Sequence, residues 1–102
     1  MITWVRSGNI HDGKRIEGIQ WALKAYVYVN EKFDLNVTVQ TNVAGPLNQL
    51  HWVATYESMA DFEEAATKII EDAGYQQLVV EANEQKLYDG SSLTDSFYRT
   101  IG

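Results

Sequence analysis

A few polar and aromatic side chains in strand-like segments are the best candidates for binding a ligand. They are Arg6, His51, Trp52, Tyr56 and Arg99. A guanidinium can bind a carboxylate or a carbonyl, and a histidine can move a proton. The aromatic rings, together with Trp4 and Tyr98, could line an apolar pocket of the kind that small molecules occupy. These residue types predict a binding site for a small apolar or aromatic molecule.

Each candidate also has a purely structural interpretation. His51 could be a hydrogen-bonded structural histidine, and each arginine could form a salt bridge with one of the many acidic side chains. Aromatic residues at alternate strand positions are more often part of a core or an interface than of a pocket. No Ser-His-Asp arrangement and no glycine-rich phosphate loop occurs. The catalytic residues, if the protein is an enzyme, are therefore not identified by the sequence.

Composition excludes several kinds of site and partner. The chain has no Cys and only two His, so we expect no metal site and no cofactor. The net charge of the chain is −6, and the excess of acidic side chains lies in residues 57–95. This argues against nucleic acid and anionic membranes as partners. The start, MITWVRSGN, does not resemble a signal peptide. We therefore expect a cytoplasmic protein.

One long segment of the chain carries no charge. Residues Leu35 to Tyr56 contain no Asp, Glu, Lys or Arg, although the chain has fourteen acidic and eight basic side chains. Alternating residues on both sides of Gly45-Pro46 predict a pair of strands there. A sheet with one solvated face usually carries polar and charged residues on it. Both faces of this hairpin are therefore expected to be covered.

The predicted elements follow a recognisable order. We expect four strands, at residues 2–7, 35–43, 49–56 and 96–101. We expect one helix at residues 12–33, between the first two strands, and a second helix, broken into 59–73 and 75–86, before the last strand. Residues 1–102 thus form a single α+β domain with the ferredoxin-like βαββαβ order and a four-stranded antiparallel sheet. In the strand at 49–56, Trp52 and Tyr56 share one face and His51 lies on the other.

Local signals predict how the helices begin and end. Asp12 is expected to cap the first helix, and Ser58 with Asp61 forms a capping-box pattern at the start of the second. Gly74 is expected to end that helix in a left-handed conformation. Ile16, Ile19 and Leu23 follow the helical period and predict the buried face of the first helix.

Two helices can cover only one face of such a sheet. We expect the other face to carry large apolar side chains, including a Trp and a Tyr, which monomers seldom leave exposed. A second copy of the same face is the simplest cover. The sequence therefore predicts a homodimer in which two sheets pack against each other, with side chains or a small ligand between them.

The segment from Asn48 to Asp61, NQLHWVATYESMAD, resembles the NIPSNAP-like members of the dimeric α+β barrel superfamily. In them a strand with a His-Trp-like pair runs into Tyr-x-Ser and an acidic helix start, and the element order is similar over nearly the whole chain. The resemblance implies a ferredoxin-like dimer but supplies no catalytic residues. The superfamily also contains monooxygenases of the antibiotic-biosynthesis type and haem-degrading proteins.

Three functions remain open from the sequence. The first is an uncharacterised homodimer that binds a small ligand between its sheets. The second, implied by the resemblance, is a cofactor-independent monooxygenase or isomerase, and the third is a structural dimerisation module. Haem binding is not expected, because neighbouring His51 and Trp52 point to opposite faces of their strand.

Overall fold

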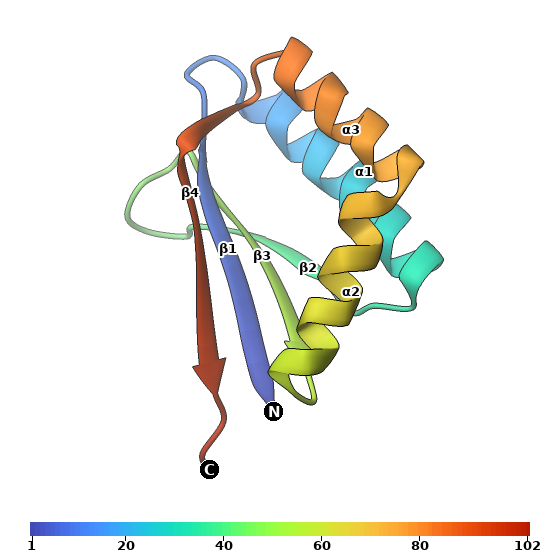
Figure 1. The fold of residues 1–102 in the computed structure, drawn as a ribbon. Coiled ribbons are helices and arrows are strands. Elements are labelled where there is room, and N and C mark those ends of the chain that lie inside the picture. The colour runs from blue at the N-terminus through green and yellow to red at the C-terminus, as the bar shows by residue number, and fades with distance from the viewer.

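In the computed structural model, which describes residues 1–102, a four-stranded sheet is covered by three helices (Figure 1). The elements are β1 (Ile2–Ile10), α1 (Arg15–Phe33), β2 (Thr38–Thr41), β3 (Gln49–Tyr56), α2 (Met59–Glu71), α3 (Ala73–Glu84) and β4 (Tyr88–Arg99). The strand order is β2-β3-β1-β4, and every neighbouring pair is antiparallel. The predicted α+β, ferredoxin-like order is confirmed, including the break in the second helical region.

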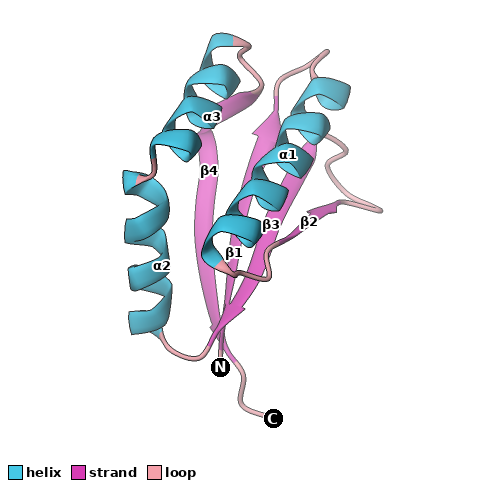
Figure 2. Ribbon diagram, turned by 90° about the vertical axis from the view of Figure 1, so that its right-hand side faces the viewer, coloured by secondary structure: helices cyan, strands magenta, loops and turns pink.

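All three helices lie on the same side of the sheet (Figures 1 and 2). We call this side the covered face and the opposite side the open face. Strand residues alternate between them, and the pairing of Arg6 with Trp52 and of Ser7 with His51 aligns equivalent positions across β1 and β3. No helix of the structure combines the length and the apolar character needed to cross a membrane.

The buried face of α1 consists of small residues. Gly18, Ala22, Ala25 and Val29 are buried there, whereas Ile16 is 68% exposed. The prediction that Ile16, Ile19 and Leu23 form the buried stripe was therefore wrong for Ile16 and Leu23, and Ile19 is only half-buried. Small side chains let the helix lie close to the sheet: a Cβ on Gly18 would come within 2.8 Å of the Ile10 Cγ2 atom.

The interior contains two groups of buried residues. One joins Ile10, Ala22 and Leu50, and the other joins Val29, Val37 and Ala54. Trp52 packs against both groups, so it links the two halves of the core. The core is therefore concentrated beneath α1, over β3 and the middle of the sheet.

Two of the three predicted helix boundaries were wrong. The Ser58 hydroxyl accepts a hydrogen bond from the Asp61 amide at 3.2 Å, which confirms the capping box. Asp12 does not cap α1, whose N-cap position is Lys14 without a side-chain cap. Gly74 lies inside α3, and the break falls at Asp72, whose carboxylate caps α3 through the Tyr75 amide at 2.9 Å. A carboxylate cap thus replaces the predicted glycine stop.

The outer strands differ in length from the prediction. β4 begins at Tyr88 rather than at residue 96, and β2 covers only Thr38–Thr41 of the predicted 35–43. The Gly-Ser-rich residues 90–92 look like a loop, yet β4 pairs with β1 on both sides of a register shift between Ser7 and Asn9. Residues 90–92 lie within this shift, between the paired residues Asp89 and Thr94, so their turn-like composition marks a bulge inside one continuous strand.

Candidate functional site

The sheet brings Arg6 and Asp95 together on the covered face. These residues are direct partners in the β1–β4 register, and Arg6 donates from Nε and Nη2 to the two Asp95 carboxylate oxygens at 2.7 and 2.9 Å. The hydrogen bond from Arg6 is the main reason that the pKa of Asp95 is lowered, and Asp95 in turn raises the pKa of Arg6. The pair is therefore ionised and has no net charge.

One nitrogen of Arg6 remains without a protein partner. Asp95 uses Nε and Nη2, and no hydrogen bond is formed by Nη1. The guanidinium carbon lies 5.3 Å from the centroid of the Trp4 ring, within the range of a cation–π contact. The Arg6 side chain is 40% exposed and that of Asp95 is 32% exposed, so a small molecule could reach both.

A group of aromatic rings extends from Trp4, beside this pair, toward α2. Phe62 of α2 lies 5.9 Å from Trp4, 5.3 Å from Tyr56 and 4.9 Å from Phe97, measured between ring centroids. The last two contacts are edge-to-face. Phe62 thus anchors the first half of α2 on the sheet, and Ile69 packs its second half against the Val29, Val37 and Ala54 group.

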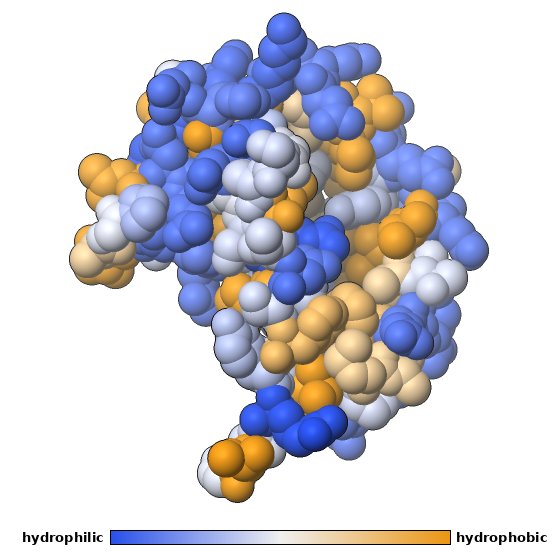
Figure 3. Space-filling model, turned by 60° about the vertical axis from the view of Figure 1, so that its left-hand side comes forward, coloured by the Kyte–Doolittle hydropathy of each residue, from blue (hydrophilic) through white to orange (hydrophobic).

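We call Trp4, Arg6, Phe62, Asp95 and Phe97 the Arg6 cluster. The helices leave the β4 end of the covered face partly open, since Leu93 and Phe97 are 43% and 41% exposed. Figure 3 shows the molecule from this side, with a hollow between the sheet and the helices and apolar residues gathered below it. The Trp4 indole Nε1 is buried and faces Asp95, whose pKa it helps to lower, without forming a well-aligned hydrogen bond. The cluster thus combines rings with one free donor, the Arg6 Nη1.

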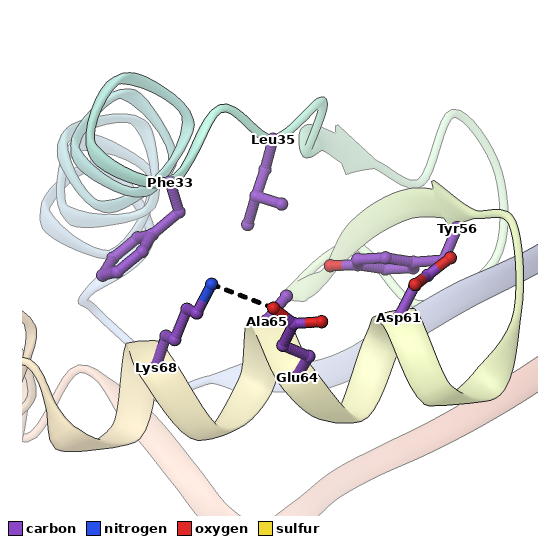
Figure 4. Close-up of a pocket in the computed structure, with 7 residues that line it drawn as sticks. All are labelled: Phe33, Leu35, Tyr56, Asp61, Glu64, Ala65 and Lys68. Atoms are coloured by element: carbon purple, nitrogen blue, oxygen red, sulfur yellow. Dashed lines mark hydrogen bonds and ion pairs between the residues drawn. The ribbon is translucent and has the colours of Figure 1, made fainter.

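A second depression lies on the other side of Tyr56. Its volume is about 230 Å³, below the usual range of about 300–1,000 Å³ for ligand pockets. It is lined by Phe33, Leu35, Tyr56, Asp61, Glu64, Ala65 and Lys68 (Figure 4). Lys68 and Glu64 pair across its rim at 3.1 Å, and burial raises the pKa of Tyr56. This depression is small, and the only charge in its lining without an ion-pair partner is the carboxylate of Asp61.

His51 lies on the open face, away from the Arg6 cluster. Its Nδ1 is 2.6 Å from the Ser7 hydroxyl and its Nε2 is 2.6 Å from the Asn42 side-chain oxygen. Asn42 donates its amide hydrogens to the Pro46 carbonyl and to Gln49 at 2.7 and 2.9 Å. Both nitrogens of the ring are therefore engaged with the protein.

Trp52 and Arg99 have different surroundings. Trp52 lies 6.5 Å from Trp21 and 5.6 Å from Tyr88 between ring centroids, within the core beneath α1. Arg99 is the last residue of β4, is exposed, and makes no hydrogen bond or ion pair. The five predicted site residues thus do not form one site: Arg6, Trp52 and Tyr56 are on the covered face and His51 is on the open face.

The sequence did not point to Asp95, Phe62 or Phe97. Asp95 and Phe97 lie in the strand that was placed too late in the chain, and their proximity to Arg6 and Trp4 depends on the β1–β4 register. Phe62 follows the helical period with Ala66 and Ile69, so only its place on a core-facing stripe could be predicted. No group of three or more His, Cys, Asp or Glu is arranged to hold a metal ion.

The fold is shared with solved structures. No protein-family model matches the sequence, and no curated protein matches it significantly. A NIPSNAP family protein from Agrobacterium tumefaciens superposes with a TM-score of 0.83 at 21% identity, covering 98% of this chain and 92% of that one. An uncharacterized NIPSNAP domain protein from Burkholderia xenovorans gives 0.82 at 15% identity, covering 99% and 95%.

SnoaB, a cofactor-independent oxygenase from Streptomyces nogalater, superposes less well, with a TM-score of 0.67 at 11% identity and coverage of 99% and 93%. At such identities the likeness shows the fold. It confirms the resemblance seen in the sequence, and the NIPSNAP proteins superpose better than the oxygenase.

Proposed function

We propose that this protein is a homodimer assembled through its open sheet face, and that each subunit binds a small neutral aromatic molecule at the Arg6 cluster. The dimer was predicted from the hairpin without charge, and the ligand from the aromatic and arginine residues of the strands. The proposal assigns the two roles to different faces, because Trp4, Trp52 and Tyr56 all lie on the covered face.

The composition of the open face supports the dimer. Its central rows across the sheet contain Thr38, Gln40, His51, Val53, Thr55, Thr3, Val5, Ser7, Thr94, Ser96 and Tyr98, and none of these carries a formal charge at neutral pH. The row at one end contains Gln49, Asn9 and the acidic Asp89, so charge on this face is confined to its ends. The expected tryptophan is absent from this face, so close packing of small β-branched and hydroxyl side chains would join the subunits. A two-fold copy presents the same uncharged surface.

Light scattering tests the assembly, with Val53→Lys as the perturbing variant. Val53 lies in a central row with Val5 and Thr38, so the lysine enters the middle of the open face from both subunits. Like charges brought together in an interface cost several kcal/mol, so we expect the dissociation constant to rise at least about 100-fold. Val43→Lys is the matched control, because Val43 is fully exposed in the loop between β2 and β3. A wild-type monomer at micromolar concentration would refute the dimer.

The free Nη1 of Arg6 beside aromatic rings carries the ligand proposal. A carbonyl oxygen can accept from Nη1, and an N–H or O–H of the same molecule can donate to Asp95. Asp95 already neutralises the guanidinium, so a second carboxylate would meet a like charge next to it. A neutral aromatic amide, carbonyl compound or phenol therefore fits better than an aromatic acid.

Benzamide and benzoate are suitable probes, observed through the tryptophan indole N–H signals in NMR spectra. The chain has only three tryptophans, and Trp4 alone belongs to the cluster. We expect millimolar benzamide to shift the Trp4 signal, and benzoate to shift it less. Asp95→Asn should reverse this preference, because it leaves Arg6 as an unpaired cation. Arg6→Gln should abolish both effects.

The same spectra distinguish the other binding places. Shifts confined to the Leu35 and Ala65 methyl groups would place the ligand in the 230 Å³ depression instead. Shifts of the Val5 and Val53 methyl groups would place it between two sheets, as the sequence first suggested. Absence of any shift with both probes would leave the structural dimerisation module as the function.

A further inference from the structure

The hydrogen bonds around His51 determine where its proton lies. Asn42 donates to the Pro46 carbonyl and to Gln49, so its amide nitrogen faces the loop and its oxygen faces His51. An oxygen of this kind only accepts, so His51 Nε2 must carry the hydrogen and donate. In the neutral ring Nδ1 is then an acceptor, and the Ser7 hydroxyl donates to it at 2.6 Å. With His51 uncharged, every group in this series of hydrogen bonds, from Ser7 through His51 and Asn42 to Pro46, has a matching donor or acceptor.

We propose that His51 makes the dimer sensitive to pH, holding the subunits together while neutral and separating them when it gains a proton. The inference rests on the proposed dimer through the open face. Histidine is the ordinary side chain whose charge changes between about pH 5 and pH 8. Among the strand residues of this face it is the only group that can acquire a charge in that range, and the other histidine, His11, lies near Asp89 at the end of the face.

The neighbours of His51 offer no compensation for a positive charge. Ser7 on β1 and Gln40 on β2 flank it directly, and Thr94 on β4 lies beyond Ser7 in the same row. Val53 and Gln49 are its neighbours along β3. None of these side chains is ionisable in the relevant range, so the new charge would be buried without a partner from its own subunit.

The nearest acidic residues lie at the ends of the open face. Asp89 pairs with Asn9 beyond the register shift of β4, and Glu57 follows the end of β3. The strand spacing places Asp89 about 12 Å from His51, too far for an ion pair. The pKa of Asp89 is lowered mainly by its hydrogen bond from Ser91, so this carboxylate already has a local partner. A two-fold copy also brings a second His51 to the same interface.

Protonation does not require the local fold to open. The imidazolium can still donate from Nε2 to Asn42, and its new Nδ1–H can donate to the Ser7 oxygen, whose hydroxyl then turns away. The subunit therefore stays folded while the surface that it offers to its copy becomes charged. Burial of unpaired charge disfavours association, so acidification favours the monomer.

The dissociation constant of the wild-type protein, measured by analytical ultracentrifugation between about pH 8 and pH 5, tests this inference. We expect it to rise at least about tenfold on acidification, with an unchanged far-UV circular dichroism spectrum. His51→Gln should remain dimeric with no such dependence. His11→Gln, which changes the exposed histidine outside the sheet, should keep the full dependence. In NMR spectra at pH 8, His51 should show the Nε2–H tautomer and Asn42→Ala should lose that preference.

The outcomes separate this inference from the proposed assembly. A wild-type dimer that is equally strong at both ends of the range, or stronger in acid, would overturn the pH dependence and leave the dimer intact. Equal pH dependence in His51→Gln would assign it to another group and overturn the role of His51. A monomer under all conditions would overturn both the dimer and the switch.

Discussion

Phe62 is the residue that should decide whether α2 stays on the sheet. None of the residues of α2 is fully buried, and Phe62 is its contact with Trp4, Tyr56 and Phe97. Truncation in Phe62→Ala removes these three ring contacts without introducing a polar group. We expect α2 to be weakened most, and with it the wall of the Arg6 cluster.

The magnitude follows from burial and ring geometry. A fully buried Phe→Ala change costs about 3–5 kcal/mol, and Phe62 is only half-buried, so about half of that applies. Such truncation costs already include the lost ring contacts, two of which are edge-to-face here. We therefore expect the free energy of unfolding to fall by about 1.5–2.5 kcal/mol. Phe62→Leu should lose less, because it keeps most of the apolar area.

Urea denaturation and hydrogen exchange together test this prediction. Ile70→Ala is the matched control, because Ile70 lies on the same helix and is 66% exposed, so its loss should be within about 0.5 kcal/mol. In Phe62→Ala the amides of α2 should exchange faster than those of α1. Equal stability losses for the Phe62 and Ile70 variants would refute the view that Phe62 anchors the helix.

Two further predictions concern the junction between α2 and α3. Asp72 pairs with Lys32 and accepts from the Tyr28 hydroxyl at 2.5 Å, and chiefly the hydrogen bond from Lys32 lowers its pKa to about 2. Because the pKa of Asp72 is lower in the folded than in the unfolded state, its ionised form stabilises the fold above about pH 4, and this stabilisation is lost as the pH falls through 2. In thermal melts, Asp72→Asn should lack the part of the acid-dependent fall in melting temperature that comes from this group. Gly74→Ala should lower the melting temperature, since its Cβ would lie 2.7 Å from Tyr28 Cζ. An unchanged melting temperature would contradict this clash.

The order of helices and strands, and the alternation of side chains between the two faces of a strand, could be predicted from the sequence because both depend on local periodicity. The separation of His51 from Trp52, for example, follows from their being neighbours in one strand, and the structure places them on opposite faces. The capping of α2 by Ser58 is equally local. Such features need no knowledge of which strands are adjacent.

Contacts that depend on register could not be predicted. Arg6 meets Asp95 only because β1 and β4 pair in one alignment, and nothing within either segment specifies that alignment. The long β4 was missed for the same reason, since Tyr88 and Asp89 pair with β1 only across a bulge that contains the Gly-Ser residues. In α1, close approach to Ile10 selects Gly18 and Ala22, and this packing outweighs the stronger apolar signal of Ile16.

The two faces of the sheet have different chemistry, so the proposed assembly and the proposed ligand binding can be perturbed separately. Arg6 and Ser7 are sequence neighbours, yet one side chain reaches Asp95 on the covered face and the other reaches His51 on the open face. A change on one face need not disturb the other, because the strand backbone lies between them. Val53→Lys should therefore dissociate the dimer while benzamide still shifts the Trp4 signal, and Arg6→Gln should lose the probe while the dimer persists. Loss of both properties in either variant would mean that the ligand site is completed by the second subunit.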